Sequence, residues 1–474
     1  MKRFGFPVIV VFAACLFLSG CQAMFSIVKP ALENEGEIYI YLEPFSQEAE
    51  RLKFKLEGVS VLRDDGAEFP LVVLMPELKL QDVKRQRLFA SCRLSPGRYT
   101  GFVFKVKNAS LKTEDGEAAL NIPDVPARGD FLFNVERKKA FVISMEFKYK
   151  ESIKSGFSFS PVFSIFIPEK PINSLIGYVT NSGSDIITIF DKKKIEVTGV
   201  IAMGRGPKGI TLDKTIDRAY VALYGEDAVE VVDVSGNNII SRINLNPGDN
   251  PQELALTPDR KTLITANTSS NTVSIIDTGL LSEVARITVG DNPNSVLIDQ
   301  TGTLAYVFNT FSNNISVINI LTREVVNTLS TGPEPLRGVF SRNGEMLYVI
   351  HRGFPYIVVL KPSSTPPFLS ILRQESIGMG MSFIKVDSAT NLLYISKKYD
   401  SQVAIYDPFS LRPVDYILSE GAAGYTTIDG EENNLYLVIP EKRKLAVFNL
   451  VNRRIVSEID TGEDPYWVTV MGER

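Results

Sequence analysis

Short runs of alternating apolar and polar residues recur along most of this chain, and Gly, Asn, Asp and Pro separate one run from the next. The run Thr272–Asp277 is one example. Alternation with a period of two residues predicts half-buried β-strands, and the residues between the runs predict tight turns. Between residues 37 and 167, no amphipathic helix pattern is longer than about two turns. The pattern therefore predicts an all-β protein.

One pattern occurs seven times in the C-terminal two thirds of the chain. Its first positions are Tyr178, Tyr220, Ile264, Tyr306, Tyr348, Tyr394 and Tyr436, which are 42, 44, 42, 42, 46 and 42 residues apart. A second apolar run ends thirteen residues after each of them, at Asp191, Asp233, Asp277, Asn319, Lys361, Asp407 and Asn449. A period near 42 residues with four short strands per copy is typical of propeller blades rather than of helical repeats.

A turn of the form Gly-x-x-Pro ends thirteen residues before the first position of a copy, or occupies the same place after the last copy. It is found at residues 204–207, 248–251, 290–293 and 462–465, and Pro335, Met381 and Ala423 hold the proline place elsewhere. Glycine permits the unusual φ of a sharp turn, and proline fixes φ where a strand begins. We expect these turns to connect the outer strand of one copy to the inner strand of the next.

The segment Tyr178-Val179-Thr180-Asn181, the Gly-x-x-Pro turn and the Val-x-Ile-Asp strand end resemble the YVTN family of β-propeller repeats over residues 172–474. The first copy lacks a preceding turn and strand, whereas a surplus strand at residues 466–470 has no copy after it. We therefore predict a seven-bladed β-propeller over residues 172–474, closed by pairing of this C-terminal strand beside the strand that begins at Ile176.

Residues 37–171 show alternating strands without the repeat, which predicts a separate β-sandwich. Residues 94–100, 115–116 and 158–166 resemble an Ig- or transthyretin-like domain of unknown function found in bacterial lipoproteins. That resemblance implies a fold and no activity. The Pro-rich residues 168–171 are the expected hinge between sandwich and propeller.

The chain begins with Lys2 and Arg3, followed by an apolar run over residues 8–18 and by Leu18-Ser19-Gly20-Cys21. This is the arrangement of a secretory signal, and the last four residues resemble the bacterial lipobox. We predict a lipoprotein signal peptide at residues 1–20, a lipidated Cys21 and a short membrane tether at residues 21–36. A plain signal peptide with an incidental cysteine and an uncleaved anchor are the alternatives. The expected location is the cell envelope, and, because Gln22 follows the cysteine, the outer membrane in a Gram-negative source.

Composition excludes several classes of function. Fifty-one Lys and Arg against 55 Asp and Glu leave a net charge of −4, which does not favour a nucleic-acid partner. One histidine and three cysteines are too few for Ser-His-Asp or Cys-His nucleophile systems, His-ligated haem or multi-His zinc sites. We therefore predict no catalytic residues and no cofactor. Core packing explains the aromatic content of 10%.

Two sets of charged residues are candidate sites. The loops between the second and third strands of the last three blades carry a basic sector of His351, Arg352, Lys397, Lys398, Lys442, Arg443 and Lys444. It predicts a contact for an acidic partner, or else solvated loop charge. His351 is expected in a surface loop. Asp249, Asp291 and Asp464 in the turns are weak candidates for Ca²⁺, although such residues are also ordinary in tight turns.

The leading hypothesis is a lipid-anchored, non-enzymatic envelope protein that presents a propeller face to an envelope protein or a ligand. The alternative is a propeller lactonase or lyase that uses a divalent ion at the channel mouth. A third hypothesis, a cofactor-binding propeller of electron transfer, lacks the His and Cys-x-x-Cys-His motifs that a haem needs.

Overall fold

The computed structural model describes residues 32–114 and 116–474. The predicted signal peptide, Cys21 and most of the predicted tether lie outside these residues. Over the described ranges, no helix is long and apolar enough to cross a membrane.

The N-terminal part of the described chain is built from two sheets over one core. The first sheet has the order β13 (Phe163–Phe166), β10 (Ala140–Phe147), β1 (Gly36–Leu42), β6 (Arg87–Leu94) and β4 (Val72–Val73). The second contains β3 (Glu68–Pro70), β2 (Leu52–Arg63), β7 (Gly97–Thr113) and β8 (Gly116–Ala119), with β5 (Glu77–Lys79) beside β2 and β9 (Ala127–Val135) beside β7. Side chains from both sheets, such as Ile40 and Phe104, share one buried cluster. This part is a β-sandwich.

Short elements complete the sandwich and the segment after it. They are the 3₁₀ helices Gln47–Arg51, Leu80–Asp82 and Asn173–Leu175, the helix α1 (Tyr149–Ser152), and the strand pair β11 (Ile153–Lys154) and β12 (Ser158–Phe159).

Seven four-stranded sheets follow in the described residues. The first combines β14 (Ile176–Asn181), β15 (Ile186–Asp191) and β16 (Glu196–Ala202) with β41 (Pro465–Val470). The next three consist of β17 (Pro207–Asp213), β18 (Arg218–Leu223), β19 (Ala228–Asp233) and β20 (Asn238–Asn244); β21 (Pro251–Leu256), β22 (Thr262–Asn267), β23 (Thr272–Asp277) and β24 (Ser282–Thr288); and β25 (Pro293–Ile298), β26 (Leu304–Asn309), β27 (Asn314–Asn319) and β28 (Glu324–Ser330).

The last three sheets have the same order of strands. They consist of β29 (Pro335–Phe340), β30 (Leu347–His351), β31 (Tyr356–Pro362) and β32 (Leu369–Ser376); β33 (Met381–Val386), β34 (Leu393–Lys397), β35 (Gln402–Tyr406) and β36 (Pro413–Leu418); and β37 (Thr426–Ile428), β38 (Asn434–Ile439), β39 (Lys444–Asn449) and β40 (Arg454–Asp460), with the 3₁₀ helix Pro440–Lys442 between β38 and β39.

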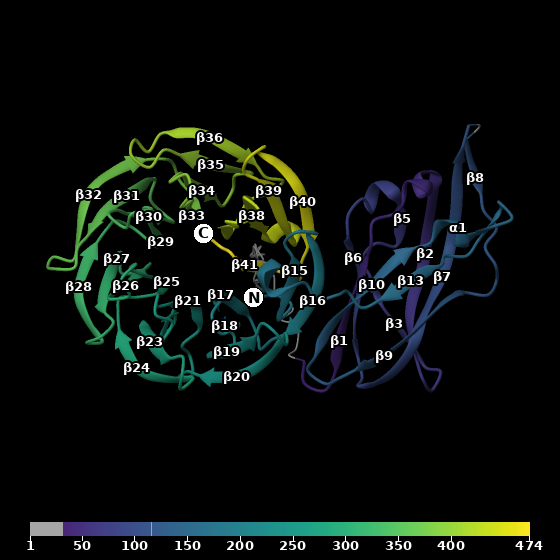
Figure 1. The fold of residues 1–474 in the computed structure, drawn as a ribbon, viewed down its shortest axis with the longest axis horizontal. Coiled ribbons are helices and arrows are strands. Elements are labelled where there is room, and N and C mark those ends of the chain that lie inside the picture. Colours follow the sequence, from purple (N-terminus) through teal and green to yellow (C-terminus); the bar gives the residue numbers. More distant parts are fainter. Residues whose placement is uncertain (1–31, 115) are drawn as a thin grey trace, which may run out of the picture. The chain divides into compact units, whose positions relative to one another are not determined.

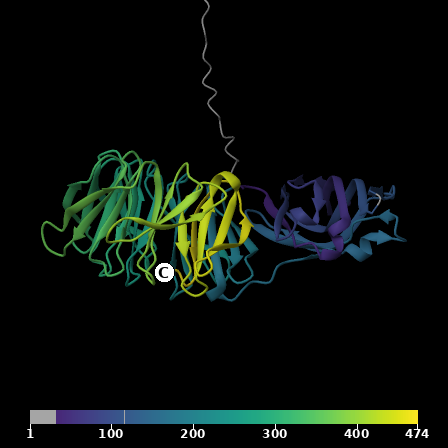
Figure 2. The same cartoon turned by 90° about the horizontal axis from the view of Figure 1, so that it is seen from above.

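The sheets form a ring, as Figure 1 shows. Their inner strands contact one another in a closed cycle that runs through β17, β21, β25, β29, β33, β37 and β41 and back to β17. The pairing that completes the first sheet is antiparallel, with Val179 opposite Val468 and Thr180 opposite Trp467. The predicted pairing of the C-terminal strand beside the strand that begins at Ile176 is therefore confirmed. Figure 2 shows the C-terminal end at one face of the ring.

The repeated residues have clear structural roles. The tyrosine at the first position of a copy is buried between sheets, and Tyr178, Tyr220 and Tyr436 are fully covered. The residue thirteen places later closes the turn between the third and fourth strands: Asp277 Oδ1, for example, accepts the backbone N–H groups of Gly279 and Leu280 at 2.9 and 2.8 Å. Asp and Asn recur there because a short carboxylate or amide can bind the backbone two and three residues on.

Direct contacts join the sandwich to the first and last sheets of the ring. Arg85 and Arg87 bind the carboxylate of Asp460 at 2.7 and 2.8 Å. The Gln86 amide accepts the N–H of Val197 at 2.7 Å and donates to its carbonyl oxygen at 3.2 Å. Tyr39 and Tyr41 enter a buried cluster with residues of β15, β16 and β39. The sandwich thus covers β16 and the end of β40 that contains Glu458 and Asp460.

Candidate functional site

The connecting turns and the loops between second and third strands lie on the same side of the ring, as expected. Each turn is hydrogen-bonded to the loop of the sheet that it enters: Thr310 and Phe311 donate to the carbonyl oxygens of Asn292 and Asp291 at 3.0 and 3.1 Å. The turns also connect the outer strand of one sheet to the inner strand of the next. This side of the ring is called the turn side below.

The turn glycines are needed for two reasons. The expected unusual φ occurs at Gly248, at 85°, whereas a second reason applies at Gly290 and Gly462. A left-handed φ also lies on the residue before the proline, at 48° for Asn250 and 54° for Asn292, and not on Gly290. A Cβ on Gly290 would lie 2.2 Å from Ser312 Oγ and 2.8 Å from Asn309 Cβ. Gly462 meets Ser184 and Asn181 in the same way. At Gly290 and Gly462, glycine is therefore required because the turn packs directly against the neighbouring loop.

Each inner strand presents two residues just after the turn, and we call these residues the mouth cluster. Its members are Lys208, Gln252, Asn294, Leu336, Ser382, Gly424 and Tyr466 at the first place, and Gly209, Glu253, Ser295, Arg337, Phe383, Tyr425 and Trp467 at the second. These places differ from copy to copy, whereas the positions around them repeat. Residues that depart from a repeat are free to serve function rather than the common fold.

A chain of polar side chains connects four adjacent inner strands of the mouth cluster. Lys208 Nζ donates to Gln252 Oε1 at 3.3 Å, Gln252 Nε2 to Asn294 Oδ1 at 2.6 Å, and Asn294 Nδ2 to the carbonyl oxygen of Leu336 at 3.1 Å. Lysine and amide groups retain unused donor capacity in such a chain.

A buried ion pair lies beside this chain. Arg337 Nη2 on β29 binds Glu253 Oε1 on β21 and so reaches past the intervening strand β25. The two side chains are 11% and 3% exposed. Burial raises the pKa of Glu253, and the Arg337 charge opposes that rise.

Three aromatic residues surround the other side of Arg337: two lie on the inner strands β33 and β41, and one lies directly before β37. Its guanidinium carbon lies 4.4 Å from the ring centre of Phe383 and 5.5 Å from those of Tyr425 and Trp467. Tyr425 stacks on Trp467 with 3.6 Å between ring centres. A guanidinium within about 6 Å of a ring centre is attracted by the ring quadrupole. Core packing is therefore an incomplete explanation of the aromatic content. The sequence gives no signal for this aromatic cluster, because its members lie far apart along the chain.

Lys208 is the second cation of the mouth cluster. Its ammonium group lies 3.4 Å from the ring centre of Tyr224 and 5.4 Å from that of Tyr466. Burial lowers its pKa to about 8, although Asp464 and Glu253 favour the charged form. Lys208 and Arg337 together give the turn side a cationic, aromatic-walled centre.

The predicted basic sector is divided between exposed cations and ion pairs. Arg352 and Lys398 are exposed, and Lys398 Nζ lies 5.3 Å from the ring centre of Tyr399. Lys444 pairs with Glu458 at 2.6 Å, Arg443 with Glu463 at 3.0 Å and Lys442 with Glu420 at 3.5 Å, while Lys397 donates to the carbonyl oxygen of Ile377.

His351 is not a surface-loop residue, so that expectation is wrong. It is the last residue of β30, fully buried, and its Nε2 lies 3.3 Å from Thr331 Oγ1. Burial lowers its pKa to about 4. His351 occupies the place that Asn181, Asn267 and Asn309 hold in other copies, and all three are fully buried as well.

The three candidate calcium ligands lie in turns that enter three different sheets, and each has a protein partner. Both oxygens of Asp249 are bound by Arg286, at 2.6 and 2.8 Å. Asp291 accepts from Asn271 at 3.1 Å, and Asp464 accepts from Ser182. Throughout the part of the chain that the structure describes, no three His, Cys, Asp or Glu residues are grouped as a metal site.

The end of the ring opposite the turns is held by buried ion pairs. Lys192 is fully buried and lies 3.2 Å from Asp429 and 3.1 Å from Glu431. Lys385 binds Glu473 at 2.8 Å. Lys192 thus joins the first sheet to the last, and Lys385 on β33 joins the sixth sheet to the segment that follows β41.

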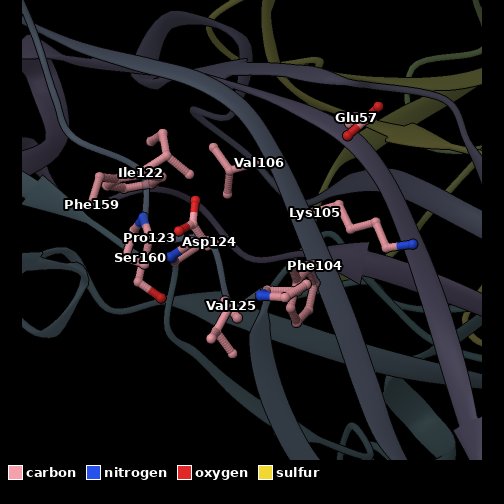
Figure 3. Close-up of a pocket in the computed structure, with 13 residues that line it drawn as sticks. Glu57, Phe104, Lys105, Val106, Ile122, Pro123, Asp124, Val125, Phe159 and Ser160 are labelled. Carbon is pink, nitrogen blue, oxygen red and sulfur yellow. The ribbon is translucent and has the colours of Figure 1, made fainter.

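A separate pocket of about 200 Å³ lies in the sandwich. Figure 3 shows Val106, Ile122 and Phe159 grouped beside Asp124, with Lys105 and Glu57 apart from them. Its wall includes the exposed loop at residues 123–126, and its polar groups form no catalytic arrangement.

Comparison with known proteins supports the fold. A family model of YNCE-like β-propellers matches residues 173–346. No curated protein matches the chain. A solved protein from Lactobacillus plantarum is 15% identical with a TM-score of 0.55, and the match covers 62% of this chain and 98% of that one. The chain has a β-propeller fold.

Two other solved propellers carry functional names. A candidate 6-phosphogluconolactonase from Bacteroides fragilis has 15% identity and a TM-score of 0.53, over 64% of this chain and 99% of its own. The dihydro-heme d1 dehydrogenase NirN has 14% identity and a TM-score of 0.51, over 64% of this chain and 77% of its own. At these identities the likeness is one of fold alone, because propellers host unrelated functions.

Proposed function

We propose that this chain is a lipid-anchored binding protein of the cell envelope, in which a seven-bladed propeller over residues 172–474, closed by β41, binds an anionic group of a partner or ligand at the mouth cluster. The anchor is the acylated Cys21, with residues 1–20 removed as the signal peptide.

The observation that carries the proposal is the convergence of Lys208 and Arg337 with the aromatic residues around them. Glu253 neutralises one of the two cations, which leaves Lys208 as the charge available to an anionic group. The rings offer stacking surfaces and the amides of Gln252 and Asn294 offer donors. Binding sites are typically formed by such apolar walls with a few convergent polar groups.

A pair of lysine variants tests the binding role. Desolvation lowers the pKa of both Lys208 and Lys214, but Lys214 is exposed and lies near Glu473 and Lys192 at the opposite end of the ring. We expect Lys208→Met to weaken capture of the envelope partner by the full chain about tenfold or more, and Lys214→Met to leave it unchanged. Equal capture by both variants, with unchanged melting temperatures, would contradict the mouth as the binding site.

The anchor is tested separately. Cys21→Ser should abolish incorporation of labelled palmitate and move the protein from the membrane to the soluble fraction. A variant that stays in the detergent-extracted membrane fraction would contradict the lipid anchor and leave the binding role untouched.

A further inference from the structure

The outer strands of the ring have two comparable positions, which lie opposite the first and third residues of each third strand. We call them rim positions. In five sheets both are polar. The residues are Arg242, Arg286, Thr328, Gln374 and Glu458 at one position. They are Asn244, Thr288, Ser330, Ser376 and Asp460 at the other. Polar rim positions are expected of outer strands that face water.

Two outer strands depart from this rule. β16 has Val200 and Ala202 at its rim positions, and β36 has Tyr416 and Leu418. In β16 the reason is visible, because Val200 is 6% exposed and packs in one cluster with Tyr41 and Val142 of the sandwich. The sandwich thus packs on the apolar rim of β16, whereas it contacts the polar rim of β40 through ion pairs of Arg85 and Arg87 with Glu458 and Asp460.

β36 has the same apolar character and is open. Tyr416 and Leu418 are 58% and 61% exposed, and Val414 is 55% exposed. The backbone N–H of Tyr416 donates to the carboxylate of its own neighbour, Asp415, at 2.8 Å. An exposed apolar edge strand is a template for pairing with another strand.

We propose that β36 is the interface with a second copy of this chain, formed by two antiparallel β36 strands with Tyr416 facing Tyr416 on a two-fold axis. This register sets Val414 opposite Leu418 in both halves. It also sets Arg412 opposite Glu420, because each lies four residues from Tyr416. Both side chains are exposed, and Glu420 would contact Arg412 in addition to Lys442 of its own chain, which lies 3.5 Å away. The strand is thus self-complementary in shape and charge, as an isologous interface requires.

The oligomeric state of the full chain in mild detergent tests the proposal. We expect a dimer by sedimentation velocity, and a monomer for the double variant Tyr416→Arg, Leu418→Asn, which has the rim residues of β20. Ile240→Ser on β20 is the matched control, since Ile240 is 45% exposed and lies outside the interface. It should remain dimeric. Unchanged melting temperatures show that each variant folds. A monomeric wild type, or a double variant that stays dimeric, overturns the proposal.

Cross-linking tests the register. Tyr416→Cys brings two thiols together on the axis, so a short bis-maleimide should link the copies through residue 416. Ile240→Cys and the parent chain, which retains Cys92, serve as controls and should give no such link. A dimer that fails to cross-link through residue 416 overturns the proposed pairing.

Discussion

Arg337 on β29 and Glu253 on β21 form an ion pair across the intervening strand β25, so three inner strands of the ring are held together by one buried contact. The same guanidinium lies against Phe383, Tyr425 and Trp467. It therefore links the polar and the aromatic halves of the mouth cluster.

Breaking this pair should be costly. Arg337→Leu leaves Glu253 buried without its partner and should lower the free energy of unfolding by about 3–5 kcal/mol. Because burial raises the pKa of Glu253 and Arg337 opposes the rise, the variant should also lose stability as pH rises above the ordinary value of 4.5. Urea denaturation at several pH values measures both effects. The double variant with Glu253→Gln should recover most of the loss, and a double variant as unstable as Arg337→Leu would contradict the role of the pair.

Because of Lys208, the free energy of unfolding should rise with pH in the alkaline range. Burial lowers its pKa to about 8 from 10.5, so between these values the unfolded state binds more protons than the folded state. Stability should therefore rise with pH across this window, and the penalty of burying the charge should be fully present below pH 8. Urea denaturation of the wild type and Lys208→Met between pH 7 and 10.5 tests this, with the rise expected to be smaller in the variant. Parallel curves for the two proteins would contradict it.

Asp460 should determine how firmly the sandwich is attached to the ring. It binds Arg85 and Arg87, accepts the N–H of Leu88 at 3.0 Å and is 10% exposed. Asp460→Ala leaves both guanidinium groups without this partner and should cost about 2–4 kcal/mol. Protease cleavage at residues 168–171 should become faster, whereas the exposed pair Lys139–Glu136 provides a control variant, Glu136→Ala, that should change nothing.

The same contact should weaken in acid. Burial raises the pKa of Asp460, but Arg85 and Arg87 more than offset it, so its pKa lies below the ordinary value of 3.8. The stability that it contributes is present above that value and is lost as pH falls through the lower folded-state pKa. An Asp460→Asn variant should show a smaller acid dependence than the wild type in thermal melts.

The turn glycines should tolerate alanine unequally. Gly290→Ala meets Ser312 and Asn309, and should lower the free energy of unfolding by about 1–3 kcal/mol. Adding Ser312→Ala removes one of the two contacts and should restore part of the loss. In contrast, a Cβ on Gly248 meets no atom within 4 Å, so the cost there comes only from its φ of 85°. Chemical denaturation of the three variants checks the ranking, and a double variant no better than Gly290→Ala would contradict the steric explanation.

Local patterns in the sequence predicted the architecture well. The turns, the Asx residues at the strand ends and the pairing of β41 with β14 follow from spacings that recur in every copy, because each copy must bury the same surfaces. The burial of His351 was also available in that spacing, since it takes the place of buried asparagines in three other copies. The residues next to a lone histidine carry no such signal, whereas its place in the repeat does.

The mouth cluster could not be predicted in the same way. Glu253 and Arg337 are 84 residues apart and differ from their counterparts in the other copies, so periodicity gives no signal for them. When the seven copies are aligned on the turn proline, Lys208 falls in the column directly after it, and Glu253 and Arg337 fall in the next column. A closed ring of such copies places these two columns around one channel mouth. The ion pairs that neutralise much of the basic sector depend on side-chain geometry, which no sequence spacing contains.

The pairing of Trp467 with Thr180 joins residues that are 287 positions apart. During synthesis, the edge of β14 that pairs with β41 therefore stays unpaired until residues 465–470 have been made. Such distant contacts form slowly, and an unpaired strand edge is open to the wrong neighbour in the meantime. Until β41 pairs with it, the edge of β14 is thus a site at which this molecule can aggregate.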